Sequence, residues 1–199
     1  NEKKFNLNNK FLDSGVGDKI NFQKPFIMVS QHSVTTECNN TTRQIEATME
    51  AIIKINMQKI ILWPNPDAGS DDISRIFRKY REKRKITNAR FYKNFPPEIY
   101  MKLMSKTSCL VGNSSSGIRE GAYIGTPVVN IGTRQSKRER GKNTIDCDYK
   151  KEEIYNSILK QIKKKKYKKE YIYGEGSSGK KISNILQKVK VKIQKQISY

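Results

Sequence analysis

Short apolar blocks alternate along the chain with longer stretches in which apolar and polar residues are mixed. An uninterrupted apolar block is typical of a strand buried on both faces of a parallel sheet. The mixed stretches carry apolar residues three and four positions apart, as in a helix with one buried face. We therefore expect strands over residues 25–30, 59–64, 89–95, 109–112 and 126–132, and helices over 41–56, 71–83, 96–107, 150–165 and 176–194.

Strands that alternate with helices predict the α/β class, a Rossmann-like parallel sheet with helices on both faces. Residues 25–199 are expected to form this one domain, and the polar residues 1–24 to precede it as a linker or as the end of an upstream domain. In such sheets ligands bind outside the carboxyl ends of the strands. The loops that follow the strands should therefore lie along one edge of the sheet and bring any binding residues together.

The chain is strongly basic, with 40 Lys and Arg against 19 Asp and Glu and a net charge of +21. Such an excess favours polyanionic partners. Much of it, however, lies in the last third, where lysines alternate with Ile, Leu and Val as on the solvent face of amphipathic helices. We therefore expect no nucleic-acid partner, and a basic module that binds polyanions stays open as the alternative.

Other features of the composition narrow the class of protein. No apolar run is long enough to cross a membrane, and the first residues lack the apolar core of a signal peptide, so we expect a cytoplasmic protein with no membrane partner. Cys38, Cys109 and Cys147 are widely spaced, and the chain has one histidine. We expect neither a metal site nor a disulfide framework.

The stretch "GNSSSGIRE" follows an expected strand and leads into a helix. Serine hydroxyls and free N–H groups at the start of a helix suit a phosphate or pyrophosphate, and a glycine there lets the chain approach closely. The residues concerned are Ser114, Ser115, Ser116 and Gly117. Glu120 suits a ribose diol, which donates two hydrogen bonds. The pattern fits a clamp for a nucleotide diphosphate, and it fits equally well an ordinary helix with a capping box.

Three further residues follow expected strands and belong on the same edge. His32 can transfer protons near neutral pH or stabilise a departing phosphate, although a lone histidine is more often structural. Arg134 can bind a diphosphate through its guanidinium group. It is also the first residue of a basic loop that could simply be exposed to solvent. Asn65 can hydrogen-bond a base or a sugar, although Asn-Pro is also a common turn.

The glycine-rich stretch "YGEGSSGKK" resembles two nucleotide-binding motifs. Gly174, Gly176 and Gly179 match the spacing of a dinucleotide fingerprint, and Lys180 matches a P-loop lysine. Both motifs require a preceding buried strand, whereas a lysine-rich stretch precedes this one. Lys181 also replaces the Ser or Thr of the P-loop. We interpret the stretch as a lead into the last helix.

Several of these motifs occur together and in order: "QHSVTTE", "WPNPDAGSDD", "VGNSSSGIREGAYIGTPVVNIGTRQSKRERGKN" and "YGEGSSGKKISNIL". In this combination the chain resembles, over about residues 24–190, the C-terminal half of hydrolysing UDP-N-acetylglucosamine 2-epimerases. The resemblance implies one half of a glycosyltransferase-B fold, in which two Rossmann-like domains hold the nucleotide sugar between them. It also implies the reaction of UDP-N-acetylglucosamine with water to N-acetylmannosamine and UDP, for sialic-acid-type sugars.

The resemblance assigns roles to the residues already named. The diphosphate would lie at Ser114, Ser115 and Ser116, and the uridine ribose at Glu120. Asn65 and the backbone near Phe95 would meet the nucleotide, with Arg134 close to the phosphates and His32 as the catalytic histidine of this half. No cofactor is implied, and we expect the UDP-sugar as the ligand and a homo-oligomer in the complete enzyme.

The chain departs from the family pattern in two respects. Ser33 stands where the family usually has proline after the histidine. No segment before residue 24 resembles the N-terminal domain, whose acidic residues handle the C2 proton in the family, so we expect this chain alone to be inactive. The alternatives are a UDP-binding fragment without activity, a non-hydrolysing epimerase or a glycosyltransferase of the same fold, and the polyanion-binding module.

Overall fold

The structure is a computed structural model and describes residues 10–190. The described part contains a seven-stranded sheet in the order β1-β4-β3-β2-β5-β6-β7, parallel except for β1, which pairs antiparallel with β4. The strands are β1 (Val16–Gly17), β2 (Phe26–Ser30), β3 (Gln58–Leu62), β4 (Ala89–Tyr92), β5 (Cys109–Gly112), β6 (Val128–Ile131) and β7 (Thr144–Cys147).

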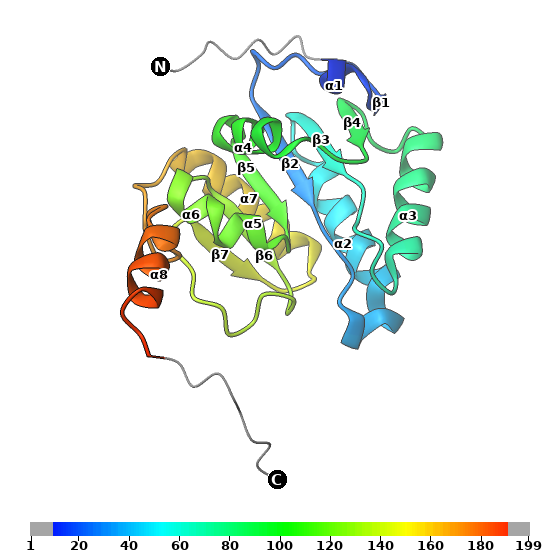
Figure 1. Ribbon diagram of the computed structural model, residues 1–199. Helices are drawn as coiled ribbons and strands as arrows, with labels where there is room; N and C mark the ends of the chain where they lie inside the picture. The colour runs from blue at the N-terminus through cyan, green and yellow to red at the C-terminus, as the bar shows by residue number, and fades with distance from the viewer. Residues whose placement is uncertain (1–9, 191–199) are drawn as a thin grey trace.

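Helices cover both faces of this sheet (Figure 1). One face packs against α2 (Thr41–Ile53), α3 (Ser70–Glu82) and α7 (Lys151–Lys164). The other packs against α4 (Pro97–Lys106) and α6 (Glu120–Ile124), with α5 (Ser115–Ile118) beside them. The remaining elements are α1 (Lys10–Asp13), the 3-10 helix η1 (Thr35–Asn40) and α8 (Ser178–Leu186).

The continuous apolar blocks of the sequence arise because each central strand is buried on both faces. In β2, Ile27 and Val29 point into the core under α2, whereas Phe26 and Met28 point into the core under α4. Successive side chains of a strand alternate between faces, so most positions of a strand covered on both sides are apolar. The α/β prediction with a parallel sheet and helices on both faces is confirmed.

The five expected strands are confirmed as β2 to β6, with β5 at the expected bounds and the other four within two or three residues of theirs, and the expected helices correspond to α2, α3, α4, α7 and α8. The edge strands β1 and β7 were not predicted. Both carry exposed or half-exposed residues, so neither shows the apolar block of a buried strand. The end of the helix expected over 176–194 lies outside the described residues, as do residues 1–9 of the expected linker.

The chain reverses its direction of winding between β2 and β5. It moves outward through β2, β3 and β4, and then returns to place β5 on the other side of β2 and continues to β6 and β7. The loops after β2 and β5 therefore leave in opposite directions and open a crevice at their carboxyl ends. Figure 1 shows the two strands side by side with their arrowheads toward the same edge.

Gly112 ends β5 at the point where the backbones of β2 and β5 come closest. Its φ is 131°, a value that side-chain-bearing residues rarely adopt, and a Cβ atom there would overlap the carbonyl of Ser30. We expect Gly112→Ala to lower the free energy of unfolding by about 2–4 kcal/mol, which urea denaturation measures.

Gly179 provides the control, because it lies in α8, where an added Cβ would meet no atom within 4 Å and φ is outside the left-handed region. Gly179→Ala should leave stability unchanged or raise it slightly, since alanine favours the helix. A Gly112→Ala protein as stable as the wild type would contradict the close approach of β2 and β5.

Candidate functional site

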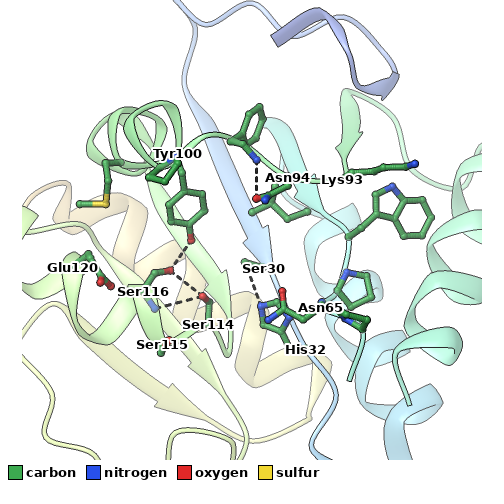
Figure 2. A pocket seen from close by; sticks show the side chains of 17 residues that line it. Ser30, His32, Asn65, Lys93, Asn94, Tyr100, Ser114, Ser115, Ser116 and Glu120 are labelled. Atoms are coloured by element: carbon green, nitrogen blue, oxygen red, sulfur yellow. Dashed lines mark hydrogen bonds between the residues drawn. The ribbon is translucent and has the colours of Figure 1, made fainter. Parts of the chain in front are cut away.

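A cavity of about 620 Å³ opens at the carboxyl ends of the central strands (Figure 2). Loops that follow β2, β3, β4 and β5 all contribute to it, together with the first turns of α4. The volume is in the range of sites for small molecules. Its lining consists of Ser30, His32, Leu62, Trp63, Pro64, Asn65, Pro66, Lys93, Asn94, Phe95, Pro97, Tyr100, Met101, Ser114, Ser115, Ser116 and Glu120.

Asn113 holds the loops after β2, β5 and β6 together beneath the cavity. Its side chain is fully buried, accepting from the backbone N–H of His32 at 2.7 Å and donating to the carbonyl of His32 at 2.8 Å. Its own carbonyl accepts from Gln135 at 2.8 Å and from Arg134 at 3.2 Å. A side-chain amide can pair with a backbone N–H and C=O at once, so one residue fixes the position of the histidine loop.

The serine loop adopts a capped turn. Ser114 is the N-cap of α5, with an extended backbone and an Oγ that accepts from the N–H of Ser116 at 3.4 Å. The Oγ atoms of Ser114 and Ser116 are 2.9 Å apart, and the Tyr100 hydroxyl lies 2.6 Å from the Ser116 Oγ. All three serines are half-buried and line the cavity. The capped-helix and anion-clamp interpretations are thus compatible, because the capped loop faces open space.

His32 lies on the opposite side of the cavity from Glu120 in the view of Figure 2. Its Nδ1 accepts from the backbone N–H of Asn65 at 3.1 Å, which leaves the proton of a neutral ring on Nε2, 3.4 Å from the Ser30 Oγ. Burial, and then the positive charge of Arg134, lower the pKa of His32 to about 4, against a smaller opposing effect of Asp67. The imidazole is therefore neutral at pH 7 in the unliganded protein.

The far wall of the cavity comes from the loops after β3 and β4. Phe95 is buried and its ring packs on Tyr92, with 4.5 Å between centroids. Its backbone N–H donates to the side chain of Asn94 at 2.8 Å. Trp63 packs on Phe77 and Phe91. This wall combines aromatic and apolar residues with the polar side chains of Asn65, Lys93 and Asn94, and its aromatic part is suited to the face of a planar ring.

Arg134 lies behind the serine loop rather than in the cavity lining. Its guanidinium donates to the carbonyl of Asn113 and lies 3.8 Å from the Asp67 carboxylate. It lines a neighbouring hollow of about 480 Å³ together with Thr133, Ser33 and Glu37. The positive charge of Arg134 nevertheless affects the cavity, because it contributes to the lowered pKa of His32.

The structure thus brings most of the residues singled out in the sequence into one cavity: His32, Asn65, Phe95, Ser114, Ser115, Ser116 and Glu120. Gly117 is buried and packs on the sheet, where a Cβ would come within 2.9 Å of Val128. The sequence did not single out Tyr100, Asn113 or Gln135. Asn113 could have been found, because it is a polar residue directly after a buried strand. The contact of Tyr100 with Ser116 depends on tertiary structure alone.

Two other kinds of feature are absent from the described part of the chain. Residues 10–190 contain no group of three or more His, Cys, Asp or Glu side chains arranged to hold a metal ion. Within the same residues, no helix has the length and apolar character needed to span a membrane.

A parallel sheet with a polar cavity at its reversal point defines a Rossmann-like α/β domain, and comparison with solved structures identifies it as half of a glycosyltransferase-B fold. The Methanocaldococcus jannaschii UDP-GlcNAc 2-epimerase in complex with UDP-GlcNAc and UDP matches with a TM-score of 0.66 at 16% identity, over 83% of this chain and 47% of that one. The Neisseria meningitidis UDP-GlcNAc 2-epimerase bound to UDP-GlcNAc matches with a TM-score of 0.65 at 16% identity, over 85% and 46%.

The sequence profile of the family described as UDP-N-acetylglucosamine 2-epimerase matches residues 2–187, and the chain belongs to this family. It is 29% identical over 166 residues to a Legionella pneumophila UDP-N,N'-diacetylbacillosamine 2-epimerase (hydrolyzing). The alignment covers 83% of this chain and 43% of the relative. It is 31% identical over 143 residues to a Campylobacter jejuni GDP/UDP-N,N'-diacetylbacillosamine 2-epimerase (hydrolyzing), over 71% and 36%. The chain thus spans less than half the length of these relatives.

The clamp formed by Asn113 should be essential for stability. Asn113→Ala would leave the buried N–H and C=O of His32 without partners, at a cost of about 1–3 kcal/mol for each group. We expect a total loss of about 2–6 kcal/mol in the free energy of unfolding, measured by urea denaturation. Asn156→Ala, at an exposed position of α7, is the matched control and should change stability little. Equal stability of the two variants would rule out the clamp.

The lowered pKa of His32 predicts a loss of stability in mild acid. Below its ordinary pKa of 6.5 the unfolded chain binds a proton that the folded protein, with a pKa of about 4, does not. Stability should therefore fall by about 2 kcal/mol between pH 7.5 and pH 5. Since His32 is the one histidine of the chain, His32→Gln should remove this slope. If the fall in stability between about pH 7.5 and pH 5 persists in the variant, groups other than His32 cause it.

Proposed function

We propose that this chain is the nucleotide-binding half of a hydrolysing UDP-N-acetylglucosamine 2-epimerase, which converts UDP-N-acetylglucosamine and water into N-acetylmannosamine and UDP. The observation that carries the proposal is the cavity itself. It combines a serine loop, a carboxylate and an aromatic wall at the point where the sheet reverses. The three features match a diphosphate, a ribose diol and a base, which are the parts of a uridine diphosphate.

In this proposal the diphosphate binds at the hydroxyls of Ser114, Ser115 and Ser116, and Glu120 accepts hydrogen bonds from the ribose. Asn65 and the backbone near Phe95 line the opposite wall, where the base would enter. Gly117 contributes by letting the serine loop pack closely on the sheet.

The chemical contribution of this half would be stabilisation of the leaving group. Elimination of UDP from the sugar builds negative charge on the diphosphate, and donors fixed in advance stabilise that charge without reorganising. The serine hydroxyls are held by the capped turn, and Arg134 is held by Asn113 and Asp67. Both sets of donors are thus fixed before the ligand arrives.

His32 would assist the departure of UDP from the other side of the cavity. The resting imidazole is neutral, with its proton on the nitrogen near Ser30. A bound diphosphate carries negative charge, which favours the protonated ring and raises its pKa from about 4. The proposed role is therefore that of a hydrogen-bond donor or proton donor which becomes effective only when the nucleotide is bound.

Proton exchange at C2 of the sugar belongs to the other half of the enzyme in this proposal. Among the described residues that line the cavity, Glu120 is the one carboxylate, and we assign it to the ribose. We assign His32 to the departure of UDP, so the groups that exchange the C2 proton would come from outside these residues, and we propose that this chain alone binds the nucleotide without turnover.

The hydrolysing type is supported by the serine loop and by the relatives. The loop reads Asn-Ser-Ser-Ser-Gly, in contrast to the Asp-Ser-Gly-Gly that is usual in non-hydrolysing enzymes. The Legionella and Campylobacter relatives both carry the description "hydrolyzing", and both are named for a diacetylated sugar attached to a nucleotide. For this chain we assign an N-acetylated hexose attached to UDP, with N-acetylglucosamine as the sugar.

Calorimetry of the full chain with UDP tests the proposal. The wild type should bind UDP, and Ser115→Ala and Glu120→Gln should each weaken binding by about 5- to 30-fold, because each loses a hydrogen bond to a charged or diol group. Uridine, which lacks the phosphates, should respond to the Glu120 change but not to the Ser115 change.

The matched controls are Ser157→Ala and Glu152→Gln, which lie on α7, and α7 packs on the other face of the sheet. Both should bind UDP as the wild type does. Wild-type binding that neither cavity substitution affects would place the nucleotide elsewhere. Binding of DNA that weakens steeply with salt, together with indifference to UDP, would favour the polyanion-binding module.

A further inference from the structure

The serine loop is connected to α4 through a chain of hydroxyl groups. Tyr100 lies in the second turn of α4, and its hydroxyl is 2.6 Å from the Ser116 Oγ, which in turn is 2.9 Å from the Ser114 Oγ. Figure 2 shows the three groups in a row, with the Tyr100 ring reaching down from α4 and Ser114 nearest to the cavity centre. The binding roles proposed above leave the tyrosine without a function.

The hydrogen bonds in this chain can run in two directions. In the outward direction Tyr100 donates to Ser116 and Ser116 donates to Ser114. The Ser116 hydroxyl then acts on the anion through Ser114, whose hydrogen is left for an acceptor in the cavity. In the inward direction Ser114 donates to Ser116, Ser116 donates to Tyr100, and Ser114 offers the cavity only a lone pair. The direction thus decides whether Ser114 attracts or repels an anion.

The acidity of the phenol favours the outward direction, and this direction leaves the hydrogen of Ser114 free. A hydroxyl has one hydrogen and two lone pairs, and the Ser114 Oγ already accepts from the backbone N–H of Ser116. With the Ser116 hydroxyl as a second donor, both lone pairs of Ser114 are used and only its hydrogen remains free. A phenol is also a stronger acid than an aliphatic hydroxyl, so Tyr100 is the better donor of the first pair.

The surroundings of Tyr100 keep its hydrogen in place. Burial raises the pKa of Tyr100, an effect that the neighbouring Ser116, Ser114 and Ser30 hydroxyls reduce and the charge of Glu120 increases. The phenol is therefore protonated at all physiological pH values. Its ring lies next to the core under α4, so the hydroxyl is held at a fixed distance from Ser116.

We propose that Tyr100 is a positioning residue whose hydroxyl polarises the serine chain outward, so that Ser114 presents a hydrogen to an acceptor-only anion in the cavity. The inference rests on the proposed function, in which that anion is the diphosphate of a UDP-sugar. Hydrogen bonds in a chain strengthen one another, so the effect of Tyr100 reaches the ligand through two serines without direct contact.

Tyr100→Phe removes the hydroxyl and keeps the ring, so the core under α4 should be retained. We expect the affinity for UDP to fall about 3- to 10-fold, the effect of one hydrogen bond, and the affinity for uridine to stay the same. The two ligands differ only in the diphosphate, so a purely structural role would weaken both equally. Tyr155→Phe on α7 is the matched control and should affect neither ligand.

A double-mutant cycle with Ser116→Ala separates action through the serine from other effects. If Tyr100 acts through Ser116, the double variant should bind UDP as weakly as Ser116→Ala alone and no more weakly. Additive losses would overturn the inference, as would equal losses for UDP and uridine, or Tyr100→Phe that binds UDP like the wild type. A wild-type chain that does not bind UDP would instead remove the proposed function and this inference with it.

Discussion

The carboxamide of Asn113 is the interaction on which the geometry of the cavity depends. It pairs with both backbone groups of His32, while its own carbonyl holds Gln135 and Arg134. Three loops that leave three different strands are thereby fixed at one buried residue. Because buried backbone groups without partners are costly, the loops cannot separate without losing several hydrogen bonds at once. The cavity is therefore formed before any ligand binds.

The close approach of β2 and β5 makes this clamp possible. Gly112 allows the two backbones to meet at the end of the strands, and the next residue is the asparagine that reaches across to the loop after β2. The reversal of winding at the same place opens the crevice above. A single short segment, Gly112 to Ser116, thus ends a strand, joins three loops and presents the hydroxyls that face the cavity.

The electrostatics of the site combine neutral donors, the histidine and the serines, with the charges of Lys93 and Glu120 in the lining and of Arg134 nearby. His32 is held neutral by burial and by Arg134, and Arg134 is itself balanced by Asp67. An empty cavity of this kind carries little net charge and so incurs little repulsion within the fold. The binding of an anion would change the charge of the site. Its negative charge would favour the protonated form of His32 and would attract the guanidinium of Arg134.

The pattern of residues along the chain predicts the class of fold and seven of the residues that line the cavity. Apolar blocks can be continuous only where both faces of a strand are buried, and parallel strands place their following loops at one edge, so His32, Asn65, the serines and Glu120 were expected to meet. The edge strands β1 and β7 were not predicted, because strands with exposed or half-exposed residues show no continuous apolar block.

Only the tertiary structure decided how these residues are supported. The contact of Tyr100 with Ser116 joins the helix that precedes β5 to the loop that follows it, and no periodicity in the sequence predicts this contact. Arg134 donates to the backbone carbonyl of Asn113 and lies near the Asp67 carboxylate, and no local pattern in the sequence predicts either contact. The local pattern of apolar and polar residues indicates which face of a helix or strand is buried. The partner of a polar side chain depends instead on which distant segments of the chain lie next to it in the fold.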